Sequence, residues 1–235
     1  MKVIARGLSI IFHPLFVLTY MTLILLWTNP FSFGWRHVAE ADTLLIIMIM
    51  STITLPGLAV LMMKMLGWVE TFELETQAER IGPFLVAGVM YLSLYLHVTH
   101  AETFPVSLRV AVLGTLISLW GCFFINSIMK ISLHATGMGG LVAITVLTKW
   151  VFGYENAEIG LPGGANLVVP VNILLYTTIL IAGLVCTSRL IVRAHERKDI
   201  YTGFILGFMS IMISWFILKQ NFEKIVATNY TNYHE

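Results

Sequence analysis

The chain has 235 residues, of which 57% are hydrophobic and 11% are charged, and its formal net charge is +1. A soluble domain usually carries about 25% charged residues, which excludes a surface that mostly faces water. A net charge so close to zero gives no indication of a nucleic-acid partner. The composition therefore predicts a protein that lies largely within a lipid bilayer.

Long uncharged stretches indicate how the chain crosses the bilayer. Five of them contain no Asp, Glu, Lys or Arg, at 43–63, 81–101, 110–129, 167–188 and 200–218. Each is close to the roughly 20 residues that a helix needs to span about 30 Å of hydrocarbon. Barrel strands would alternate apolar and polar residues, which these stretches do not. We therefore expect spanning helices.

Two weaker candidates, at 8–27 and 131–147, complete the set. Lys2 and Arg6 precede the first, as in a signal peptide, but its apolar part is long and no small-residue cleavage pattern follows, so we expect an uncleaved span. The expected spans are 8–27, 43–66, 84–103, 108–129, 134–152, 167–189 and 200–219. They predict one all-α, polytopic bundle of about seven spans over residues 1–235, in a bacterial inner membrane.

Polar residues gather in three clusters, at 73–83, 130–137 and 188–199. Under the expected topology, a helical hairpin separates each cluster from the next. All three clusters therefore emerge on the membrane side that also holds the N-terminus, where they can converge.

The clusters contain residue types that suit phosphoryl transfer. His195 and Asp199 are four residues apart and would share one face of a helix. A carboxylate that accepts the Nδ1 proton leaves Nε2 free to act as a nucleophile. Arg80 and Arg189 supply planar, permanently charged groups that bind phosphate oxygens, and His134 could protonate a leaving oxygen. Charge stabilisation by the two arginines would replace the usual magnesium, so we expect no metal or other cofactor.

The third cluster resembles a known family signature. It reads Ser-Arg, five residues, His, three residues, Asp. This pattern is similar to the third signature of the type 2 phosphatidic acid phosphatase superfamily, which also includes the vanadium haloperoxidases. The resemblance implies a phosphohistidine mechanism in which His195 is the nucleophile, Asp199 orients it and Arg189 binds the phosphate.

The other two clusters resemble the remaining signatures of that family, in the same order along the chain. The second cluster keeps Ser132 and His134 of the family's Pro-Ser-Gly-His signature. The first resembles Lys, six residues, Arg-Pro: it keeps Arg80 and a displaced proline, but has Glu73 where the family has lysine. The resemblance implies His134 as general acid, with Arg80 and Ser132 as phosphate ligands beside Arg189.

These features predict an integral-membrane phosphatase that hydrolyses a phosphomonoester or diphosphate of a membrane lipid. Isoprenoid diphosphates, phosphatidate-type lipids and lipid A-type lipids are all candidate substrates. A catalytically inactive relative that binds or transports lipids is the alternative, and Glu73 and the altered second signature favour it. A third hypothesis is a metal-dependent enzyme that uses His97 and His100, three residues apart in one expected span.

Other residues are expected to have structural roles. His13 beside Pro14 predicts a kink in the first span. Arg189 and His195 are six residues apart, about 240° around an unbroken helix, so both can contact one ligand only if the chain bends between them. Five glycines predict close packing of helices rather than a phosphate-binding loop. They are Gly137, Gly139, Gly140, Gly203 and Gly207.

Overall fold

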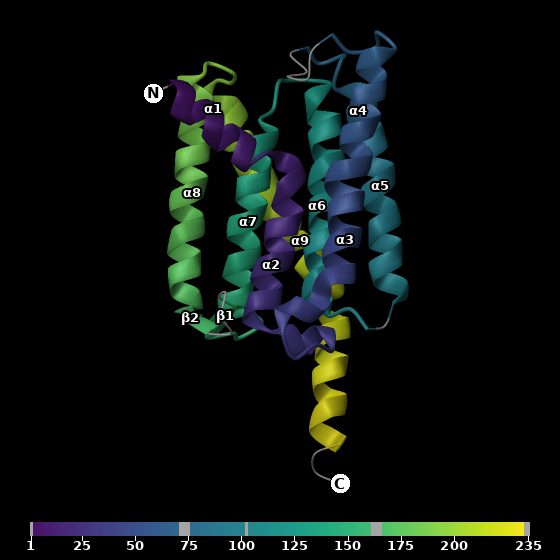
Figure 1. Cartoon of the computed structure of the whole chain (residues 1–235), viewed down its shortest axis with the longest axis vertical. Coiled ribbons are helices and arrows are strands. Elements are labelled where there is room, and N and C mark those ends of the chain that lie inside the picture. Colours follow the sequence, from purple (N-terminus) through teal and green to yellow (C-terminus); the bar gives the residue numbers. More distant parts are fainter. Residues whose placement is uncertain (1, 71–75, 102, 161–165, 233–235) are drawn as a thin grey trace.

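The fold is taken from a computed structural model that describes residues 2–70, 76–101, 103–160 and 166–232, with side chains described as far as Gln220. It is a bundle of helices with one small hairpin (Figure 1). The helices are α1 (Lys2–Ile11), α2 (Pro14–Thr28), α3 (Asp42–Ile49), α4 (Leu55–Met65), α5 (Ile81–His100), α6 (Val106–Asn126), α7 (Leu133–Trp150), α8 (Val171–Ile191) and α9 (Arg197–Asn232). Short 3₁₀ turns, η1 (Pro30–Phe33) and η2 (Val38–Ala41), follow α2, and a π-helical turn, η3 (Met50–Thr54), joins α3 to α4.

Within the described residues, five helical stretches are long and apolar enough to cross a membrane. They are Pro30–Met65, Ile81–His100, Val106–Asn126, Val171–Ile191 and Arg197–Gln220, and the bent pair α1–α2 raises the number to six. The helical membrane fold expected from the sequence is therefore confirmed, whereas a count of seven spans is not. The missing candidate is α7, which is rich in glycine and threonine and mostly buried in the bundle. Because other helices surround it, α7 needs less apolar surface than a helix that faces lipid.

An antiparallel hairpin departs from the expected all-α fold. Strands β1 (Asn156–Gly160) and β2 (Asn166–Pro170) pair from Asn156 opposite Pro170 to Gly160 opposite Asn166. The β2 sequence Asn-Leu-Val-Val-Pro contains two β-branched residues, which favour a strand. The span expected at 167–189 consequently begins only at Val171, after the strand.

The first span bends sharply, as the His13–Pro14 pair predicts. The axes of α1 and α2 differ by 59°. His13 caps α2, since its Nδ1 accepts a hydrogen bond from the Leu15 amide, and Pro14 occupies the first helical position, where its missing N–H is tolerated. Tyr20 Oη donates to the Ile11 carbonyl at 2.7 Å and holds the end of α1 against α2. The result is an α1 that lies across one end of the bundle (Figure 1).

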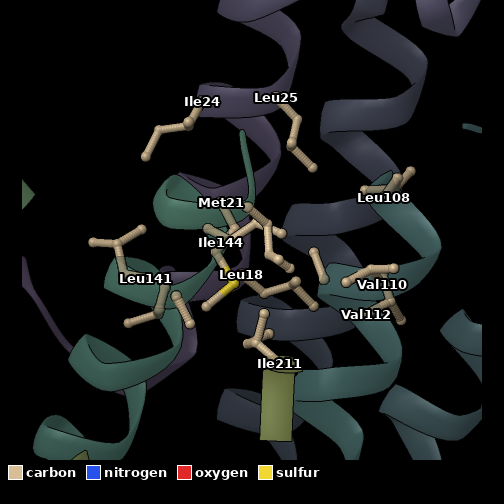
Figure 2. Close-up of a cluster of buried hydrophobic side chains, with 14 of the residues drawn as sticks. Leu18, Met21, Ile24, Leu25, Leu108, Val110, Val112, Leu141, Ile144 and Ile211 are labelled. Atoms are coloured by element: carbon tan, nitrogen blue, oxygen red, sulfur yellow. The ribbon is translucent and has the colours of Figure 1, made fainter. Parts of the chain in front are cut away.

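The core lies between α2, α6, α7 and α9, where aliphatic side chains from all four helices meet (Figure 2). Glycines bring α7 and α9 into backbone contact: a Cβ on Gly139 would collide with the Phe204 carbonyl, and one on Gly207 with the Thr136 carbonyl. The expected packing role of these glycines is thus confirmed. This contact fixes the start of α7 beside the start of α9.

The two ends of the bundle differ. The N-terminal helix α1 and the connections α4–α5, α6–α7 and α8–α9 share one end, and the β hairpin lies at the other (Figure 1). The three polar clusters belong to these three connections. We call this end the cluster end.

Candidate functional site

A cavity of about 340 Å³ opens near the cluster end and continues between the helices. Arg80, His134, Arg189 and His195 all line it, although they come from four separate segments of the chain. The expected convergence of these four residues is therefore found. Glu73, which stands in the first cluster where the family signature has lysine, lies outside the described residues.

His195 lies in the short connection between α8 and α9. Helix α8 ends at Ile191 and α9 begins at Arg197, with Arg193 between them in the left-handed region at φ 56°. A residue with a Cβ rarely adopts this conformation, and here it turns the chain sharply. This bend allows Arg189 and His195 to line the same cavity, which an unbroken helix would prevent.

Asp199 fixes the orientation of the His195 ring. His195 Nδ1 lies 3.4 Å from Asp199 Oδ2, and the side chains are only 5% and 3% exposed. The same Oδ2 accepts the Glu196 amide at 3.1 Å, so Asp199 also caps α9. Asp199 Oδ1 has no hydrogen-bond partner among the described residues. Donation from Nδ1 leaves Nε2 unprotonated, as a nucleophile requires.

The surroundings of His195 favour its neutral form. The pKa of His195 is lowered to about 4, first by burial and then by the positive charges of Arg189, Lys130 and Arg80, against the raising effect of the bond to Asp199. The ring is therefore uncharged at neutral pH.

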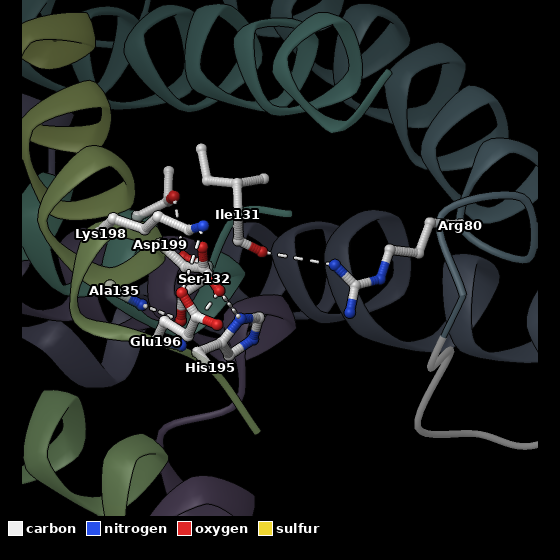
Figure 3. Close-up of polar contacts among 9 residues, drawn as sticks. Arg80, Ile131, Ser132, Ala135, His195, Glu196, Lys198 and Asp199 are labelled. Carbon is white, nitrogen blue, oxygen red and sulfur yellow. Dashed lines mark hydrogen bonds and ion pairs between the residues drawn. The ribbon is translucent and has the colours of Figure 1, made fainter. Parts of the chain in front are cut away.

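Arg80 precedes α5 and faces the start of α7. Its Nη1 donates to the Ile131 carbonyl at 3.4 Å (Figure 3). Burial lowers the pKa of Arg80, while the nearby Asp199 and Glu79 raise it, and a guanidinium keeps its charge in either case. The cavity thus carries two permanent positive charges, Arg80 and Arg189.

Ser132 has a different position from the one that the family resemblance implies. It is fully buried and is not among the residues that line the cavity. Its hydroxyl caps α7 by accepting the Ala135 amide at 3.4 Å, and its own amide donates to the Asp199 carbonyl at 3.3 Å. Ser132 therefore connects α7 to α9 through these bonds (Figure 3).

Helix α1 and the bend that follows it supply two site residues, Ser9 and His13, that the sequence did not indicate. The Ser9 carbonyl accepts His134 Nε2 at 3.0 Å, and the Ser9 hydroxyl accepts Arg189 Nη1 at 3.1 Å. His13 lines the cavity, with its ring 5.6 Å from that of His134. The sequence marked His13 only as a kink, and no pattern distinguished Ser9. Both residues reach the site because α1 folds across the cluster end.

His97 and His100 lie near the C-terminal end of α5, away from the cavity. His100 Nδ1 bonds to the Leu96 carbonyl at 2.7 Å, and the His97 ring packs near Phe104. Within the part of the chain that the structure describes, no group of three or more His, Cys, Asp or Glu residues is placed to hold a metal.

Comparison of the chain with family models, with curated proteins and with solved structures found no match.

Proposed function

We propose that the chain is a membrane lipid phosphatase that works through a phosphohistidine intermediate, as a divergent relative of the type 2 phosphatidic acid phosphatases. The observation that carries the proposal is the meeting of Arg80, His134, Arg189 and His195 at one cavity, with Asp199 behind His195. Two fixed positive charges, a neutral histidine and a second histidine match the needs of a phosphate ester that reacts without a metal.

In the first step, His195 Nε2 attacks phosphorus while Arg80 and Arg189 bind the phosphate oxygens. A P–N bond forms, and the bond between phosphorus and the lipid oxygen breaks. The negative phosphate favours the imidazolium form of His134, which gives its proton to the departing lipid oxygen. Asp199 balances the positive charge that develops on the His195 ring.

In the second step, neutral His134 takes a proton from a water molecule as that water attacks phosphorus. The P–N bond breaks, inorganic phosphate leaves, and His195 returns to its neutral form. The bonds to Ser9 use only His134 Nε2 and Arg189 Nη1. The other N–H groups of the guanidinium and the Nδ1–H of the His134 imidazolium can bind the substrate while Ser9 holds both side chains in place.

The test is phosphate release from a panel of lipid phosphates by the purified full chain in detergent. We expect His195→Ala to lower turnover by about 10³-fold or more, because water is a poor replacement for the nucleophile. His97→Ala, at the far end of α5, is the matched control and should keep full activity. Vanadate should inhibit, a chelator should have no effect, and labelled phosphate should be trapped on histidine. Full activity in His195→Ala would refute the mechanism.

A catalytically inactive lipid-binding protein or transporter is the second candidate. It is favoured by the bonds that Ser9 makes to both His134 and Arg189, and by the position of Ser132 outside the cavity. This function predicts no phosphate release from any lipid, together with lipid-phosphate binding that persists in His195→Ala.

A further inference from the structure

The cavity extends from the charged residues deep into the membrane part of the bundle. Its lining residues run from Arg80, at the N-cap of α5, through Phe84 and Ala87 to Tyr91, all on one face of the helix. At about 1.5 Å per residue, these eleven steps cover about 16 Å. The opposite wall reaches Met21 on α2, so the cavity penetrates the bundle interior.

The deep part of the cavity has an apolar wall. Besides aliphatic and aromatic side chains, it contains Thr115 and Ser118 of α6, whose hydroxyls donate to carbonyls of their own helix, those of Ala111 and Thr115, at 2.8 Å. Such hydroxyls are already satisfied and do not demand a polar ligand. A cationic mouth that leads into an apolar interior fits a ligand with an anionic head and a hydrocarbon tail.

The depth of the cavity sets the length of tail that it can hold. About 16 Å matches an extended chain of about twelve carbons, since C–C bonds of ~1.5 Å advance the chain by roughly 1.25 Å each.

We infer that the cavity between α2, α4, α5, α6, α7 and α9 binds a hydrocarbon tail of the lipid phosphate substrate. This inference rests on the proposed function. It adds that the tail enters the protein instead of remaining among the surrounding lipids. It also adds that kcat/KM depends on tail length over about the first ten to twelve carbons.

Gly57 offers a way to fill the cavity without disturbing the fold. It lines the cavity from α4, and a Cβ added there would meet no atom within 4 Å outside its own helix. A leucine at this lining position therefore adds apolar volume at the cavity wall without a collision at its Cβ. Gly183 on α8 is the matched control, because its added Cβ also meets nothing within 4 Å, while Gly183 is exposed and does not line the cavity.

The experiment measures kcat/KM for butyl, hexyl, octyl, decyl and dodecyl phosphates in a rigid sterol-type detergent. Burial of each methylene should raise kcat/KM by up to roughly fourfold until the cavity is full, after which the values level off. Gly57→Leu should lower the value for decyl phosphate by about tenfold or more while butyl phosphate changes less than about twofold, as expected for the loss of a few methylene contacts. Gly183→Leu should change none of them.

The outcomes separate this inference from the proposed function. Phosphate release without dependence on chain length, or equal effects of Gly57→Leu on butyl and decyl phosphate, would overturn the tail cavity and leave the phosphatase intact. Absence of release from every substrate would overturn the phosphatase. The tail cavity is then decided by binding of butyl and decyl phosphonates to the full chain: tighter binding of the longer chain that Gly57→Leu abolishes supports it, and equal binding overturns it.

Discussion

Replacing Asp199 with asparagine separates its charge from its hydrogen bonds. Oδ2 accepts both the His195 ring and the Glu196 amide, while Oδ1 has no partner among the described residues. An asparagine can therefore keep its oxygen toward both donors and place its amide group where Oδ1 lies. The cap on α9 is retained, so we expect the free energy of unfolding to change by less than about 1 kcal/mol.

The catalytic cost of Asp199→Asn follows from the distance between the two groups. At 3.4 Å and an effective dielectric constant of about 20, a full positive charge on His195 and the Asp199 carboxylate attract each other by about 5 kcal/mol. If roughly half of that charge has developed in the transition state, the loss is about 2 kcal/mol, or about 30-fold in kcat. His195→Ala should cost far more, about 10³-fold.

The assay compares kcat and the unfolding midpoint of Asp199→Asn, Asp199→Ala and the unchanged protein. Asp199→Ala removes the acceptor altogether and leaves the Glu196 amide without its cap, so it should also lower the free energy of unfolding by about 1–2 kcal/mol. A loss in Asp199→Asn as large as that in His195→Ala, or no loss at all, would refute the electrostatic role assigned to Asp199.

Three further predictions concern pH, packing and the first cluster. The pKa of His195 is lowered to about 4, so His195 should keep its neutral form down to that pH, whereas an ordinary histidine would lose it near 6.5. On the acid side, kcat/KM, corrected for ionisation of the substrate, should therefore fall only as the pH drops towards 4. A fall near pH 6.5 would contradict the burial of this ring. Gly207→Ala should lower the free energy of unfolding by about 2 kcal/mol or more, since its Cβ would meet the Thr136 carbonyl, whereas Gly183→Ala should not, and thermal unfolding in detergent measures both. A carboxylate that faced the phosphate would repel it by a kcal/mol or more at dielectric constants near about 20, so we expect Glu73 to point away from the phosphate. Glu73→Gln should therefore leave kcat/KM nearly unchanged. A large loss would show that the first cluster works differently from the family.

The order of the spans along the sequence is enough to predict that the three clusters meet. Helical hairpins between clusters return the chain to the same side of the membrane, so Arg80, His134 and His195 had to share one end of the bundle. The bend between Arg189 and His195 was also expected, because helix geometry made it a condition for a shared ligand.

The contributions of α1 could not be predicted in the same way. Ser9 reaches His134 and Arg189 only because α1 turns by 59° and lies across the cluster end. That placement depends on contacts between the first and the last third of the chain, and no periodic pattern in one segment reports them. The capping role of Ser132 was missed for a related reason: a serine that starts a helix and a serine that binds phosphate look the same in a signature.

The length of α9 provides a way to learn which compartment the cluster end faces. Its 36 residues amount to about 54 Å of helix, far more than about 30 Å of hydrocarbon, and α9 leaves the bundle on the side of the β hairpin (Figure 1). A fluorescent or enzymatic reporter attached after α9 would therefore stand clear of the bilayer, in the compartment opposite the cluster end. Reporter activity on one side of the membrane would place the cluster end, and with it the proposed phosphatase site, on the other side.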